Sequence, residues 1–127
     1  MREVLIVAAG GALGSSARYL LSGFILHRAL GWQFPLGTFV VNVLGCALVG
    51  VLGGFVVKHD LLSPEIRLFL FSGIAGGFTT FSAFGLETFH LLRKGEAGIA
   101  AAYVVLSVLV GLLVLWAGFV AVPRHAS

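Results

Sequence analysis

Four long apolar stretches, separated by short hydrophilic connections, constrain this chain more than any other feature. They cover residues 4–26, 36–57, 66–92 and 99–122. A helix rises about 1.5 Å per residue and the hydrocarbon core of a bilayer is about 30 Å thick, so each stretch is long enough to cross a membrane. Because a helix satisfies its own backbone hydrogen bonds, we predict an all-α membrane protein whose single domain, 1–127, has four transmembrane helices in a lipid bilayer.

Composition supports this class and argues against several others. The sequence is 59% hydrophobic and 10% charged, which leaves no length for a separate soluble domain. The net charge of +3 comes from scattered cations, and a nucleic-acid partner is not expected because no run of Lys or Arg is present. No catalytic triad order, metal-ligand spacing or phosphate-binding glycine loop indicates an enzyme. The only cysteine, Cys46, cannot form an intrachain disulfide and is expected to pack as a small residue.

The third apolar stretch contains an interruption at residues 76–84, which read Gly-Gly-Phe-Thr-Thr-Phe-Ser-Ala-Phe. Two adjacent glycines followed by hydroxyl side chains predict that the third helix is broken at Gly76 and Gly77. Non-helical backbone at membrane depth is tolerated where it is buried in protein or lines a polar cavity, so the break predicts a site for an ion or small solute. The alternative is that the glycines only let neighbouring helices approach closely.

Isolated polar and aromatic side chains within the spans suit a small anion. Asn42 must either hydrogen-bond a neighbouring helix or offer its NH2 group to a solute. Arg18 either reaches the interface or lies at a pore mouth, where it would concentrate anions. Phe81 and Phe84 share one helix face, and the edges of their rings carry partial positive charge. The other candidate pathway residues offer neutral hydroxyls, from which an ion is readily released: Thr38, Thr80, Ser82, Tyr103 and Ser107.

The distribution of cations gives the chain almost no preferred orientation. Four spans place both termini and the second connection on one side of the membrane. That side has Arg2, Lys58, Arg67 and Arg124, and the other has Arg28, Arg93 and Lys94, with Arg18 nearest this second group. Because the bias of Lys and Arg sets orientation, we predict insertion in both senses and an antiparallel, dual-topology homodimer. In such a dimer, carbonyl oxygens at the break, near the two-fold axis, would hold a monovalent cation.

At this point the residues resemble a known family, the small bacterial fluoride channels called Fluc or CrcB proteins. The motifs that carry the resemblance are residues 11–14 with Arg18, residues 37–42 with Gly45, and residues 76–84. The resemblance implies an antiparallel dual-topology homodimer with two fluoride pathways in the cell inner (plasma) membrane. It implies passive fluoride export that protects the cell from fluoride toxicity, and a structural sodium ion at the centre of the dimer.

The resemblance also implies roles for individual residues. Asn42 corresponds to the pore amide, and Phe81 and Phe84 correspond to a pair of phenyl rings beside the ion. Gly76 and Thr79 correspond to the residues whose backbone carbonyls bind sodium.

The last stretch resembles the family less completely. Tyr103 and Ser107 look like the start of a polar track along the last helix. Gly111 stands where a further hydroxyl would be expected, so the length of the track in this chain stays open.

Two other functions fit four short spans. A small dual-topology multidrug or cation exporter would need a carboxylate in the membrane for proton coupling, and Glu87 is the candidate, near one end of the third stretch. A non-transporting membrane assembly subunit would use Asn42 and the glycines for packing alone. A flux assay in liposomes separates the three functions. A channel gives passive fluoride leak, an exporter gives proton-driven cation exchange, and an assembly subunit gives no flux.

Overall fold

The computed structural model describes residues 1–124, and all regular secondary structure among them is helical. Three helices are continuous: α1 (Arg2–Arg28), α2 (Leu36–His59) and α6 (Ala97–Ala121). The third span, Pro64–Arg93, is built from α3 (Pro64–Arg67), a π-helical segment η1 (Leu68–Ala75), α4 (Gly76–Phe78) and α5 (Phe81–Arg93). These 4 segments are long and apolar enough to cross a membrane, which confirms the predicted all-α membrane protein with four spans.

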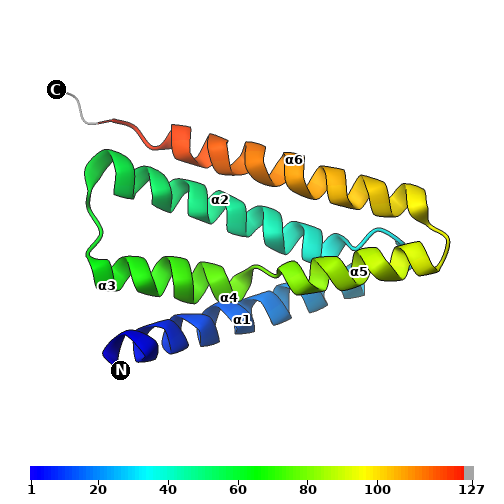
Figure 1. The fold of residues 1–127 in the computed structure, drawn as a ribbon, viewed down its shortest axis with the longest axis horizontal. Coiled ribbons are helices and arrows are strands. Elements are labelled where there is room, and N and C mark those ends of the chain that lie inside the picture. The colour runs from blue at the N-terminus through cyan, green and yellow to red at the C-terminus, as the bar shows by residue number, and fades with distance from the viewer. Residues whose placement is uncertain (125–127) are drawn as a thin grey trace.

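The order of the spans places the start of α1 and the end of α6 at the same end of the bundle. The connection between α2 and α3 also lies at this end, and the other two connections lie at the opposite end (Figure 1). Helix α2 packs most extensively against α6, while α1 packs along η1 and α4. The junction between α4 and α5 therefore lies near the middle of the bundle, where α1 and α2 both reach it.

Side chains close the bundle at the end where α1 begins and α6 ends. Ser63 caps α3 by accepting the Ile66 N–H at 3.3 Å, and Pro64 occupies the first turn as the sequence predicts. Arg67 pairs with Asp60 at 2.6 Å across the same turn. The Lys58 ammonium donates to the carbonyl oxygens of Phe119 and Val122, both at 2.7 Å. Lys58 thus satisfies two carbonyl groups that the end of α6 leaves without helical partners.

Glycines allow the close approach of α2 and α6. A methyl group at Gly50 would overlap the backbone carbonyl of Leu115, which cannot move aside as a side chain can. At Gly53, one turn further along the same helix, the nearest atom to such a methyl group would be a ring carbon of Phe119 at 3.9 Å. The two glycines therefore differ in how much space surrounds them.

We expect Gly50→Ala to destabilise the protein by about 2 kcal/mol, since the helices must separate to admit the methyl group. Gly53→Ala is the matched control and should be neutral or slightly stabilising, because Ala favours the helix and finds room. Thermal unfolding of the purified variants in detergent measures both. Equal stability of the two variants would contradict the α2–α6 packing described here.

Candidate functional site

Two residues between α4 and α5 have extended backbone. Thr79 has φ −86° and ψ 157°, and Thr80 has φ −148° and ψ 116°. The prediction that the helix breaks at Gly76 and Gly77 is wrong in its position, because Gly76 is helical with φ −63° and ψ −38°. A Cβ at Gly77 would lie 2.7 Å from the carbonyl oxygen of Gly11, so this glycine serves close packing against α1. The β-branched threonines, which favour extended backbone, occupy the interruption itself.

Asn42 holds the extended segment in place from α2. Its Oδ1 accepts the Thr80 N–H at 2.8 Å, and its Nδ2 donates to the Thr80 carbonyl oxygen at 3.1 Å. Both backbone groups of Thr80 are therefore satisfied by one side chain. The amide has two N–H donors, of which one makes this bond. Asn42 thus links α2 to the extended segment of the third span, and its second N–H group is left as a donor for a solute.

At the junction, two backbone N–H groups donate to side chains and not to the backbone carbonyls that they would meet in a continuous helix. In a continuous helix the Gly76 carbonyl would accept the Thr80 N–H, which instead points to Asn42. The Thr79 carbonyl would likewise accept the Ala83 N–H, which instead donates to the Thr80 Oγ1 at 3.2 Å. Both carbonyl oxygens thereby lose their helical partners, and hard oxygen atoms of this kind suit a small monovalent cation.

Arg18 satisfies a third carbonyl at the end of α4. Its half-buried guanidinium donates from Nε to the Gly77 oxygen at 3.0 Å, and the Ser15 hydroxyl approaches the same oxygen at 3.4 Å. In a continuous helix that oxygen would accept the Phe81 N–H. Arg18 therefore turns toward the protein, and its cation lies at the negative end of a short helix.

A cavity of about 410 Å³ lies beside the junction. Six predicted site residues line it: Asn42, Thr79, Thr80, Phe81, Phe84 and Ser107. The Ser107 Oγ is buried and has no hydrogen-bond partner among residues 1–124. A buried hydroxyl without a partner costs free energy, so Ser107 is a candidate donor to a solute.

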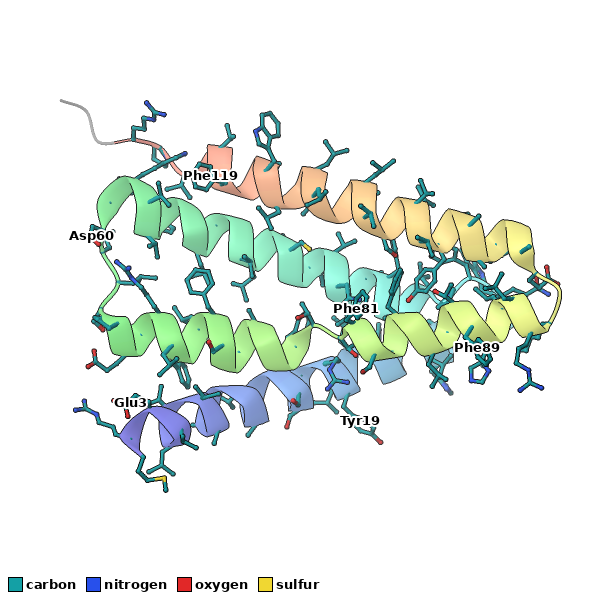
Figure 2. The ribbon with its side chains drawn as sticks, viewed as in Figure 1. Glu3, Tyr19, Asp60, Phe81, Phe89 and Phe119 are labelled. Atoms are coloured by element: carbon teal, nitrogen blue, oxygen red, sulfur yellow. The ribbon has the colours of Figure 1, made fainter. Side chains whose placement is uncertain are left out.

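Two phenyl rings stand at the start of α5. The ring centroids of Phe81 and Phe84 are 5.8 Å apart and the ring planes are tilted by 33°. Phe81 is 85% exposed although it is large and apolar, and Figure 2 marks its place at the junction between α4 and α5. A surface of this kind at the middle of a span is covered by lipid or by another protein chain.

A second polar cluster lies toward the end of the bundle that contains the α5–α6 connection. Glu87 accepts hydrogen bonds from the Thr38 hydroxyl at 2.6 Å and the Tyr103 hydroxyl at 2.7 Å. Tyr103 is completely buried, and its ring packs on Phe84 with centroids 5.0 Å apart. Phe84 therefore lies against both the cavity and this cluster.

Reasoning from the sequence considered Glu87 only as the coupling carboxylate of an exporter and did not join it to the two predicted pathway residues that contact it. The available signal was that a carboxylate in a span needs partners, and the hydroxyls of Thr38 and Tyr103 are donors. A second cavity of about 580 Å³ is lined by Thr38 and Glu87 together with residues of the α1–α2 connection.

The remaining predicted residues lie outside these two cavities. Ser82 is exposed, with its Oγ 3.4 Å from the Thr80 Oγ1. Gly76 lies in α4 and Arg18 on α1, whereas Asn42 and Ser107 lie on α2 and α6. Within residues 1–124 no three His, Cys, Asp or Glu side chains gather as a metal site, so backbone oxygens remain the candidate cation ligands.

Comparisons with known proteins agree on one family. The family described as "CrcB-like protein, Camphor Resistance (CrcB)" matches residues 5–119. A protein of Methylobacillus flagellatus named fluoride-specific ion channel FluC is 56% identical over 94% of this chain and 93% of its own length. Proteins of the same name are 48% identical in Rhizobium meliloti, over 93% and 94% of the two chains, and 40% identical in Flavobacterium psychrophilum, over 94% and 96%.

The matches span all four helical segments and include the junction between α4 and α5. The relatives are of nearly the same length as this chain, so the likeness extends over whole proteins. The chain therefore belongs to the CrcB-like family.

Proposed function

We propose that this chain forms a fluoride-selective ion channel, which exports fluoride passively across the cell inner membrane and protects the cell from fluoride toxicity. The observation that carries the proposal is the cavity beside the junction, which is lined together by the amide residue Asn42, the hydroxyl residue Ser107 and the paired rings of Phe81 and Phe84. All of these groups are neutral, so they replace water around an anion without holding it tightly. Relatives named fluoride-specific ion channels support the choice of ion.

The exit from this cavity leads toward Glu87. The Phe84 ring separates the cavity from Tyr103, whose hydroxyl donates to the carboxylate. A fluoride ion that reaches this end competes with Glu87 for the Thr38 and Tyr103 hydroxyls, so the ion is released toward the second cavity. Along this pathway the ion first meets the neutral groups of the cavity and then the Thr38 and Tyr103 hydroxyls, which also bond to Glu87.

The alternatives fit the contacts less well. A proton-coupled exporter needs a carboxylate free to exchange protons within the membrane, whereas Glu87 lies toward the end of the bundle that contains the α5–α6 connection, and both of its oxygens accept hydroxyl groups. An assembly subunit has no use for a buried, unpartnered hydroxyl in a cavity. Neither alternative accounts for the ring pair beside the Asn42 amide.

The flux of purified protein in liposomes tests the proposal. Vesicles loaded with fluoride should release it passively, while vesicles loaded with chloride should retain their ion because chloride is too large to be surrounded by the same donors. Protein-free vesicles give the background leak. Equal release of both anions, or release only under a proton gradient, would refute the proposal.

The active unit in this proposal is an antiparallel homodimer. Phe81 is exposed beside its own cavity, and a partner chain that covers this ring would complete the wall of the pathway. The two-fold axis would pass near the junction, where the carbonyl oxygens of Gly76 and Thr79 from both chains converge on a sodium ion. The diversion of the Thr80 and Ala83 N–H groups supports this site, because it leaves those oxygens available.

If the active unit is antiparallel, activity requires chains inserted in both orientations. Two Lys residues added near the C-terminus should force one orientation and remove most of the activity, since antiparallel pairs can no longer form. Co-expression with a chain biased in the opposite sense should restore it. Fluoride flux and labelling of the termini from each side of the membrane measure the two effects. Full activity from a population labelled on one side only would contradict the antiparallel dimer.

A further inference from the structure

The second cavity, of about 580 Å³, has charged residues at two levels of its wall. Glu87, His90 and Lys94 are all among the residues that line it. These three positions follow one face of α5, because residues three, four and seven apart return to the same side of a helix. Lys94 comes directly after the last residue of α5 and stands about 10 Å further along the helix axis than Glu87. The wall therefore leads from an acidic residue to a basic one.

Glu87 brings a negative charge to this cavity without a cation beside it. Both of its oxygens accept hydroxyl groups, from Thr38 and Tyr103. Among residues 1–124, no Lys, Arg or His side chain forms an ion pair with this carboxylate. Hydroxyl groups are neutral, so they leave the charge in place, and a carboxylate repels an anion that approaches it. An anion that passes Glu87 therefore moves more easily if positive charge lies nearby.

Lys94 supplies positive charge at this place. Among the described residues that line the cavity it is the only Lys or Arg, and Glu87 is the only Asp or Glu. The Lys94 side chain is exposed, but a charge acts over a distance and needs no fixed contact with the ion. At about 10 Å, with an effective dielectric constant between about 20 and about 80, a unit charge changes the local concentration of an anion by about two- to fifteenfold.

A purely structural role for Lys94 is the alternative, because cations near the C-terminus of a helix are favoured by its negative end. Arg93 offers a matched comparison. It is exposed in the last turn of α5, next to Lys94, but it is not among the described residues that line the cavity. Loss of either cation changes the charge of the helix end equally, whereas only loss of Lys94 changes the charge of the cavity wall.

We propose that Lys94 sets the rate at which anions pass through the second cavity, by offsetting the repulsion from Glu87 and concentrating small anions at this mouth. This inference rests on the proposed fluoride channel. Lys94 acts through its electric field and not through contact, so its effect fades when salt screens the field. It favours all small anions alike, so the ratio of fluoride to chloride release does not depend on it.

Fluoride efflux at two ionic strengths is the first test. Liposomes of neutral lipid hold one fluoride concentration, and an impermeant salt sets the ionic strength to about 0.01 M or about 1 M, where charges act over about 30 Å or about 3 Å. At the low value, Lys94→Gln should slow the initial efflux per channel about threefold and Lys94→Glu about tenfold, within the range given by the Coulomb interaction. At the high value both should match the wild type. Lys94→Arg should conduct like the wild type throughout, and Arg93→Gln should lose much less than Lys94→Gln.

A charge attached at position 94 after assembly is the second test, because it does not depend on how a variant folds. Lys94→Cys should conduct like Lys94→Gln at low ionic strength. A thiosulfonate reagent that attaches an ammonium group should restore the flux, and one that attaches a sulfonate group should lower it further. The wild type treated in the same way is the control for reaction at Cys46, its only cysteine.

The outcomes separate this inference from the channel itself. Absence of fluoride flux in the wild type refutes the proposed function. Wild-type flux with equal rates for Lys94→Gln and Arg93→Gln at low ionic strength overturns the role of Lys94 alone. A loss in Lys94→Gln that persists at high ionic strength also overturns it, since the side chain then supports the fold. Equal effects of the two reagents on Lys94→Cys would overturn it as well, because the sign of the charge would not matter.

Discussion

Asn42→Asp should abolish fluoride flux, with an expected loss of at least about a hundredfold. Two like charges about 4 Å apart at an effective dielectric constant of about 20 repel each other by about 4 kcal/mol, and the new carboxylate would lie in the cavity wall that the anion must pass. The substitution also replaces the Nδ2 donor, which bonds the Thr80 carbonyl at 3.1 Å, with an oxygen. The retained Oδ1 still accepts the Thr80 N–H, so the extended segment keeps one of its two supports.

Asn42→Ala is the comparison that isolates the charge. It removes the same donor and both bonds to Thr80 but adds no negative charge, so its flux should fall between those of Asn42→Asp and the wild type. Fluoride efflux from liposomes measures all three proteins, and their elution volume in detergent reports assembly. If the alanine and aspartate variants conduct equally, the anion does not pass within reach of this side chain.

The spans could be predicted from the sequence because the membrane imposes its own length and polarity on them. Residues 36–57 were predicted as a span and α2 covers Leu36–His59, and residues 99–122 correspond to α6 at Ala97–Ala121. The π-helical geometry of η1 was not predictable, because Leu68–Ala75 is apolar apart from Ser72 and its composition fits an α-helix equally well.

The candidate site could be predicted only where its residues are close in sequence. Phe81 and Phe84 lie one turn apart, so their pairing follows from helical spacing alone. Glu87 joins Thr38 and Tyr103 from two other helices, and that register depends on how the spans pack. The position of the break was misjudged because Gly76 and Gly77 fit both a break and close packing, and the contact of Gly77 with α1 decides for packing.

Sodium should stabilise the assembled protein, and Thr80→Val should weaken this effect. In the wild type, the Thr80 Oγ1 accepts the Ala83 N–H at 3.2 Å and so keeps that donor away from the Thr79 carbonyl. Valine has the same shape and the same preference for extended backbone but no hydroxyl, so the Ala83 N–H would compete with the cation for the Thr79 oxygen. Thr80→Ser keeps the cap and serves as the matched control.

The measurement is the midpoint of thermal unfolding and the fraction of dimer in sodium, compared with a large organic cation at equal ionic strength. A ligand at about 100 times its dissociation constant stabilises the state that binds it by about 2.7 kcal/mol, so the wild type should lose stability and dimer when sodium is removed. Thr80→Ser should respond in the same way, and Thr80→Val should respond much less. An equal sodium response in all three proteins would mean that the Thr79 oxygen is not a ligand. No response in the wild type would reject the cation site and, with it, the reason for two chains to meet at the interruption of their third span.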